Sequence, residues 1–128
     1  MTTTDINWLT GQIVDGAMKV HTFLGPGLLE SAYEACLAHE LRKRGLRVEC
    51  QVPVSIIYDG LRVETAFRID MLVEDLVVVE LKAVATVIPV HEVKTLTHIR
   101  LSHKRVGLLI NFHVVHLKDG IKRLINGY

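Results

Sequence analysis

Asp70, Glu80 and Lys82 are polar residues on otherwise apolar segments, and their types and spacing suit metal-assisted chemistry on a phosphate. Asp70 ends the segment Phe-Arg-Ile-Asp, and Glu80 and Lys82 end Val-Val-Val-Glu-Leu-Lys. Because successive side chains of a strand point to opposite faces, Glu80 and Lys82 share one face and Leu81 takes the other. If Asp70 lies on the neighbouring strand, two carboxylates and an ammonium group converge, and such a set can hold a divalent cation. A buried Glu–Lys ion pair is the alternative.

The elements that must position these residues follow from the apolar periodicity of the chain. Helical spacing and strand alternation predict seven main segments, and Gly and Pro residues separate them. In chain order these segments are 6–24, 28–44, 46–58, 61–71, 76–81, 89–102 and 106–112.

Two further local signals complete this prediction of secondary structure. Asp59-Gly60 predicts a hairpin turn between the first two strands, and residues 119–126 are expected to form a short terminal helix. The order α-α-β-β-β-α-β predicts one α/β (α+β) domain, residues 1–128, with a mixed central sheet flanked by helices.

The composition indicates a folded domain without a membrane anchor. Of the 128 residues, 49% are hydrophobic, which is enough for one core. The longest apolar run, near residues 106–110, is far shorter than a membrane span. The first residues lack the basic start and apolar block of a signal peptide, so we expect a cytoplasmic protein.

The net charge is +1, but the charge is unevenly distributed. Residues 1–93 contain 8 Lys/Arg and 13 Asp/Glu, whereas residues 94–128 contain 7 Lys/Arg and only Asp119 as an acid. Such a basic segment either binds a polyanion or is an ordinary solvated face. The cations that could form it are Lys94, Arg100, Lys104, Arg105, Lys122 and Arg123.

Several motifs resemble a known family. The predicted order, with an acid ending the second strand and Glu-x-Lys on the third, resembles the restriction-endonuclease-like αβββαβ core of PD-(D/E)XK nucleases. The segment Gly27–Tyr33 (Gly-Leu-Leu-Glu-Ser-Ala-Tyr) is similar to the naming motif of the small bacterial GxxExxY family within that superfamily. Residues 24–27, 51–53, 79–83 and 107–112 also resemble that family.

The resemblance implies a role for each residue of the motif. Asp70, Glu80 and the Leu81 carbonyl would hold Mg²⁺ or Mn²⁺, which prefer oxygen ligands, and Glu30 would reach the metal from a helix. Lys82 would orient or help deprotonate the attacking water and offset charge on the phosphate. Alternatively, Glu30 is an ordinary acid in the first turn of a helix, where acids are favoured.

Other residues near the predicted site have supporting roles or none. Tyr33 lies three residues after Glu30, on the same helical face, so it could support that side chain or contact substrate. The alternative is a core tyrosine with a hydrogen-bonded hydroxyl. Arg68 is a candidate phosphate contact or a solvated arginine. His91, at the start of the third helix, could assist proton transfer.

One segment departs from the pattern of the related nucleases, which often carry Gln-x-x-x-Tyr on the helix after the lysine strand. This chain has Lys94 and His98 at those positions. Lys94 keeps a hydrogen-bond donor but loses the acceptor, so it either contacts backbone phosphate or marks a site that has drifted from catalysis.

Together these observations favour a metal-dependent nuclease acting on DNA or RNA. The alternative is a catalytically weak or inactive module of the same fold that binds nucleic acid or a protein partner. A homodimer is plausible in either case, because the domain is small and many nucleases of this type cut as pairs.

Overall fold

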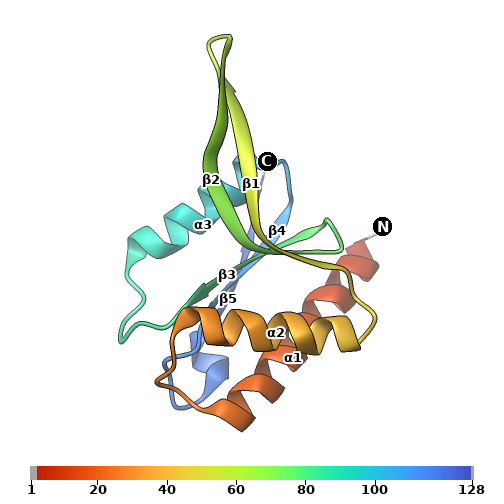
Figure 1. Cartoon of the computed structure of the whole chain (residues 1–128), viewed down its shortest axis with the longest axis vertical. Coiled ribbons are helices and arrows are strands. Elements are labelled where there is room, and N and C mark those ends of the chain that lie inside the picture. Colours follow the sequence, from red (N-terminus) through yellow and green to blue (C-terminus); the bar gives the residue numbers. More distant parts are fainter. Residues whose placement is uncertain (1–2, 128) are drawn as a thin grey trace.

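The chain folds into a five-stranded mixed sheet with helices on both faces (Figure 1). The computed structural model describes residues 3–127, so positions 1, 2 and 128 of the predicted domain lie outside it. In chain order the elements are α1 (Thr3–Leu24), α2 (Glu30–Lys43), β1 (Val48–Tyr58), β2 (Leu61–Val73), β3 (Val77–Lys82), α3 (Pro89–Leu101), β4 (Val106–Asn111), the 3-10 helix η1 (Leu117–Gly120) and β5 (Ile121–Ile125).

The strands lie in the order β1-β2-β3-β4-β5, and only β3 and β4 are parallel. The parallel pair requires a crossover, which α3 supplies. Alternate side chains of β3 enter two cores: Val77 and Val79 pack with α1 and α2, whereas Val78 packs with Ile99 of α3. The sheet therefore lies between two helical layers, which is the predicted α+β arrangement.

The β1–β2 hairpin projects from the rest of the domain (Figure 1). Its turn is formed by Asp59 and Gly60, both with positive φ (49° and 80°), as the sequence predicts. The register shifts between Val54 and Ile56, where β2 holds two extra residues. Because this shift is even, alternate side chains keep their faces along the hairpin.

The structure shows that the predicted terminal helix over 119–126 is wrong. Residues 117–120 form the single 3-10 turn η1, and residues 121–125 form β5, which pairs antiparallel with β4. The spacing of Ile121, Leu124 and Ile125 fits a helix, but the open edge of β4 offers hydrogen bonds to an extended segment. This edge pairing outweighs the local preference.

The helices otherwise agree closely with the sequence prediction. α2 begins at Glu30, two residues later than expected, and α1 buries the predicted stripe that includes Ile6, Leu9 and Ile13. Among residues 3–127, no helix combines the length and apolar character needed to cross a bilayer.

Candidate active site

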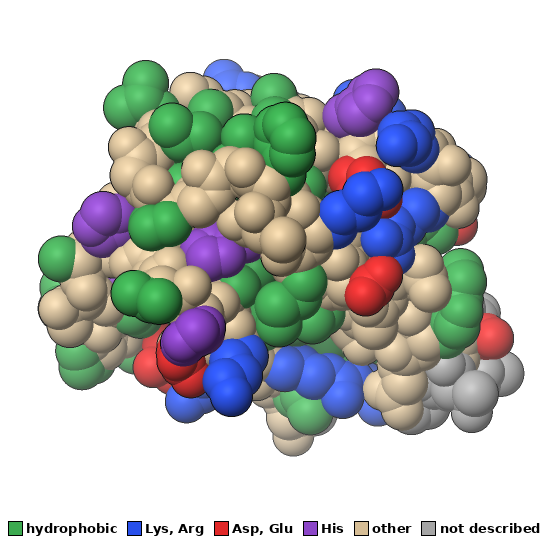
Figure 2. All heavy atoms as spheres, turned by 90° about the horizontal axis from the view of Figure 1, so that it is seen from below, with side chains coloured by type: hydrophobic (Ala, Val, Ile, Leu, Met, Phe, Trp, Pro, Cys, Tyr) green, Lys and Arg blue, Asp and Glu red, His purple; other side chains and the backbone are tan. Residues whose placement is uncertain are grey.

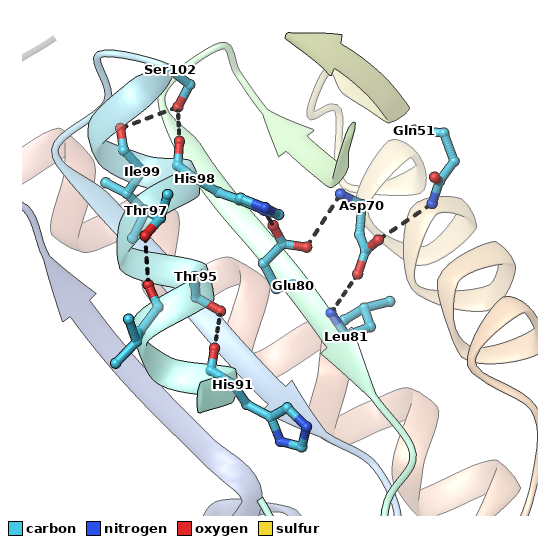
Figure 3. A network of polar contacts seen from close by, with 11 residues as sticks. Gln51, Asp70, Glu80, Leu81, His91, Thr95, Thr97, His98, Ile99 and Ser102 are labelled. Carbon is cyan, nitrogen blue, oxygen red and sulfur yellow. Dashed lines mark hydrogen bonds and ion pairs between the residues drawn. The ribbon is translucent and has the colours of Figure 1, made fainter. Parts of the chain in front are cut away.

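The candidate site lies where the pairing between β2 and β3 ends. The last pair of the ladder is Met71 with Val79, and Asp70 and Glu80 come next in the same register. Here the two acids bond to the main chain: the Leu81 N–H donates to Asp70 Oδ2 at 2.9 Å, and the Asp70 N–H donates to Glu80 Oε2 at 3.4 Å (Figure 3). Side chains thus take the place of the backbone partners of a continuing ladder. We call this point, formed by Asp70 of β2 and by Glu80 and Leu81 of β3, the fork.

Glu80 lies on the α3 side of the fork. Its Oε1 is hydrogen-bonded to Nδ1 of His98, and the His98 ring stacks on Phe67 of β2 with centroids 4.2 Å apart (Figure 3). Glu80 and His98 are each only 6% exposed. Burial raises the pKa of Glu80, the neighbouring Asp70 raises it further, and the bond to His98 acts in the opposite direction.

Asp70 lies on the α2 side of the fork, where it borders a cavity. The Gln51 amide donates to Asp70 Oδ1 at 3.4 Å and to Glu34 Oε1 at 2.8 Å, so it bridges two carboxylates. The cavity has a volume of about 230 Å³ and is lined by Glu30, Ser31, Glu34, Gln51, Asp70 and Leu81. The structure therefore brings Glu30 to the same cavity as Asp70.

Lys82 is the last residue of β3, and its main chain is held on the β4 side. The Phe112 N–H donates to the Lys82 carbonyl at 2.9 Å, and the Asn111 side chain bonds both the N–H and the C=O of Val84. The half-buried Lys82 ammonium forms no ion pair with a residue of the described range 3–127. No acidic side chain of this range therefore neutralises its charge through an ion pair.

Tyr33 explains how the loop before α2 positions Glu30. The Tyr33 hydroxyl donates to the Gly25 carbonyl at 2.6 Å and accepts from the Leu28 N–H at 3.1 Å. Its ring is fully buried and stacks on Phe112 at 4.4 Å. The structure thus places Tyr33 in the core as a brace for the loop, out of reach of a substrate, while Glu30 at the start of α2 is exposed.

Three further predicted residues form no hydrogen bond or ion pair with Asp70 or Glu80. Arg68 is exposed on β2, opposite Pro53 of β1. His91 accepts the Ile88 N–H at 3.2 Å, and so its side chain caps the start of α3. Lys94 is exposed on α3.

Three cations of the basic C-terminal segment have partners within the described residues. Lys104 pairs with Asp75 and Lys122 pairs with Glu92, while Arg123 donates to the Asn7 side chain. Seen from below, Lys and Arg side chains stand in separate groups with other side chains between them (Figure 2). The carboxylates of Asp75 and Glu92 offset part of the positive charge that this segment could present to a polyanion.

Sequence reasoning missed three residues of this site: Glu34, Gln51 and His98. Glu34 lies one helical turn after Glu30, a spacing that could have placed it on the same face. Gln51 has a positive φ of 54°, and no local pattern in an alternating strand predicts that conformation. His98 was noted only as a departure from the related nucleases.

The oxygen-rich donor set suits a hard cation. Carboxylates of Glu30, Glu34 and Asp70 face one cavity, and Glu80 lies across the fork. Within residues 3–127, no three His, Cys, Asp or Glu side chains are gathered closely enough to enclose a metal ion. Mg²⁺ commonly uses one or two carboxylates and completes its shell with water and substrate phosphate, so this open arrangement fits it.

The fold is an α+β domain with a mixed five-stranded sheet, in which Asp70 and Glu80 occupy opposing positions of β2 and β3 and Lys82 follows on β3. The family comparison identifies the class more closely. The model described as the PD-(D/E)XK nuclease superfamily matches residues 7–124. The chain therefore belongs to the PD-(D/E)XK nuclease superfamily. Neither the curated proteins nor the solved structures that were compared with the chain gave a match.

Proposed function

We propose that this chain is a metal-dependent phosphodiesterase of the GxxExxY type that cleaves DNA or RNA. The observation that carries the proposal is the fork at which Asp70 of β2 and Glu80 of β3 occupy opposing positions and are joined through the Asp70 N–H, with Lys82 two residues further along β3. Membership of the nuclease superfamily supports nucleic acid as the substrate class.

In this proposal, Asp70, Glu80 and the Leu81 carbonyl hold Mg²⁺ or Mn²⁺, and Glu30 supports the site from α2. The bound ion supplies Lewis acidity and a more acidic water at the scissile phosphate. The carboxylates of Asp70 and Glu30 would hold the ion at the cavity that they line, where a substrate phosphate would reach it. Their negative charges favour the cation and also discourage a phosphate from binding without it.

Lys82 acts on the substrate in this proposal. Its ammonium group, which has no acidic partner within residues 3–127, is free to contact a phosphate oxygen and to orient the attacking water. A positive charge placed where negative charge develops stabilises the transition state more than the ground state.

The test measures Mn²⁺ binding by calorimetry and cleavage of single-stranded and structured DNA and RNA by gel. Asp70→Asn keeps the shape of the side chain but removes its charge, so we expect loss of both Mn²⁺ binding and cleavage. Glu64→Gln is the control, because Glu64 is an exposed acid on the projecting part of the hairpin, paired with Arg62. If wild-type protein cleaves none of these substrates with any divalent ion, the proposal is wrong.

An inactive binding module is the second candidate function. The engagement of Glu80 by His98 favours it, because this bond occupies Oε1 of one of the proposed metal ligands. Exposed apolar side chains at the hairpin tip (Ile57, Tyr58 and Leu61, 62–72% exposed) offer a surface for a protein partner or a second copy. A gel shift without cleavage, unchanged by Asp70→Asn, would support this function.

A further inference from the structure

His98 is the residue of α3 whose side chain reaches the fork. Other polar side chains of the helix bond to its own main chain: Thr95 donates to the His91 carbonyl and Thr97 to the Val93 carbonyl (Figure 3). His98 instead extends across to Glu80 of β3. This is a tertiary contact between buried polar groups, and a satisfied contact of this kind makes the local arrangement more rigid.

Two contacts define the position of the His98 ring. Phe67 lies parallel to it, with an interplanar angle of 11°, and Glu80 is bonded to Nδ1. At the main chain, the His98 carbonyl accepts the Ser102 hydroxyl at 2.6 Å in the last turn of α3. The ring therefore has little freedom to turn, and Nδ1 stays directed at the carboxylate.

The two oxygens of Glu80 have different partners. Oε1 bonds to His98, whereas Oε2 faces the fork, where the Asp70 N–H donates to it at 3.4 Å. A glutamate has three side-chain torsions, and its neighbour Asp70 repels it when both are charged. Without an anchor on Oε1, the carboxylate would turn away from Asp70.

We infer that His98 is the positioning residue of Glu80: it anchors Oε1, with Phe67 fixing its ring, and so presents Oε2 to the Asp70 side of the fork. The inference rests on the proposed function, because it assigns His98 a role in preparing the metal-binding carboxylate. Lys94, at the other position where the related nucleases differ, is exposed and takes no part.

Two variants separate positioning from simple packing. His98→Asn keeps a nitrogen donor close to the place of Nδ1 but loses the ring, whereas His98→Phe keeps a ring against Phe67 but loses the donor. Removing a residue that orients a metal ligand typically weakens metal binding 10–100-fold. We expect His98→Phe to weaken Mn²⁺ binding at least about 10-fold and His98→Asn to stay within about 3-fold of wild type.

The measurements are Mn²⁺ calorimetry without nucleic acid, thermal unfolding, and long-range ¹H–¹⁵N spectra of the imidazoles. Wild type should show a protected Nδ1–H signal of His98 that shifts in Glu80→Gln. A purely structural role predicts the opposite order, with His98→Phe nearest to wild type in both stability and Mn²⁺ affinity. His39→Phe, which removes an exposed histidine of α2, controls for weak Mn²⁺ binding by surface imidazoles.

The outcomes distinguish the two proposals. If wild type binds Mn²⁺ and cleaves, but His98→Phe binds Mn²⁺ as tightly as wild type, the positioning role is overturned and the proposed function stands. If wild type neither binds Mn²⁺ nor cleaves, the proposed function is overturned, and the positioning role falls with it.

Discussion

Replacing Tyr33 by Phe should destabilise the domain through the loop before α2. The hydroxyl bridges the Gly25 carbonyl at 2.6 Å and the Leu28 N–H at 3.1 Å, and the Tyr33 side chain is fully buried. Each hydrogen bond contributes about 1 kcal/mol net, and Phe keeps the ring and its stacking on Phe112, so the free energy of unfolding should fall by about 2 kcal/mol. For a domain of this size, this loss lowers Tm by roughly 8 °C.

Urea unfolding followed by circular dichroism measures this loss, and thermal unfolding checks the change in Tm. Tyr58→Phe is the matched control, because Tyr58 is 72% exposed at the hairpin tip and its replacement should change stability by less than about 0.5 kcal/mol. The reasoning is refuted if Tyr33→Phe is as stable as Tyr58→Phe. Such a result would mean that the loop is held by other contacts.

Two further predictions concern packing and charge. A Cβ on Gly107 would lie 2.5 Å from Cδ1 of Ile99, so Gly107→Ala should lower the free energy of unfolding by about 1–3 kcal/mol. Ile99→Val removes that methyl group, so adding it should restore part of the stability in the same urea assay. A double variant no more stable than Gly107→Ala would contradict this. The Arg44 guanidinium holds the pKa of Glu40 below its ordinary value of 4.5, so the stability that the carboxylate contributes is present at pH 7 and is lost as the pH falls through its folded-state pKa. Glu40→Gln should therefore cost about 1 kcal/mol at pH 7, and a gap to wild type that persists unchanged near pH 3 would exclude this.

The sequence predicted those parts of the fold in which local pattern and tertiary pairing agree. The hairpin about Asp59-Gly60 has both a turn signal and alternating flanks, and the apolar segment before Glu80 forms the central strand as expected. Residues 119–126 were mispredicted because their spacing suits a helix as well as a strand, and only the open edge of β4 decides between them. A single sequence does not show which edge will be open.

The same contrast between local pattern and tertiary contact explains which residues of the candidate site the sequence predicted. Asp70 and Glu80 could be predicted as neighbours because acids are conspicuous on apolar strands, and the structure brings the two residues together. The partners of these acids were not found, because Gln51 and His98 come from other elements and meet the acids only after folding. The contacts of Gln51 and His98 with these acids depend on how α3 packs on the sheet and on the positive φ of Gln51 in β1. The apolar periodicity of the sequence specifies neither.

The projecting hairpin also divides the molecule into parts that need not open together. Beyond the register shift at Val54, its strands pair mainly with each other, and the tip is exposed to solvent. Local opening with little loss of buried area is inexpensive, so the amides of the tip should exchange with solvent without global unfolding. The inner boundary of this fraying lies near Phe67, whose ring stacks on His98. Because this ring pair lies between the outer hairpin and Glu80, we expect opening of the tip to leave the contact between His98 and Glu80 intact.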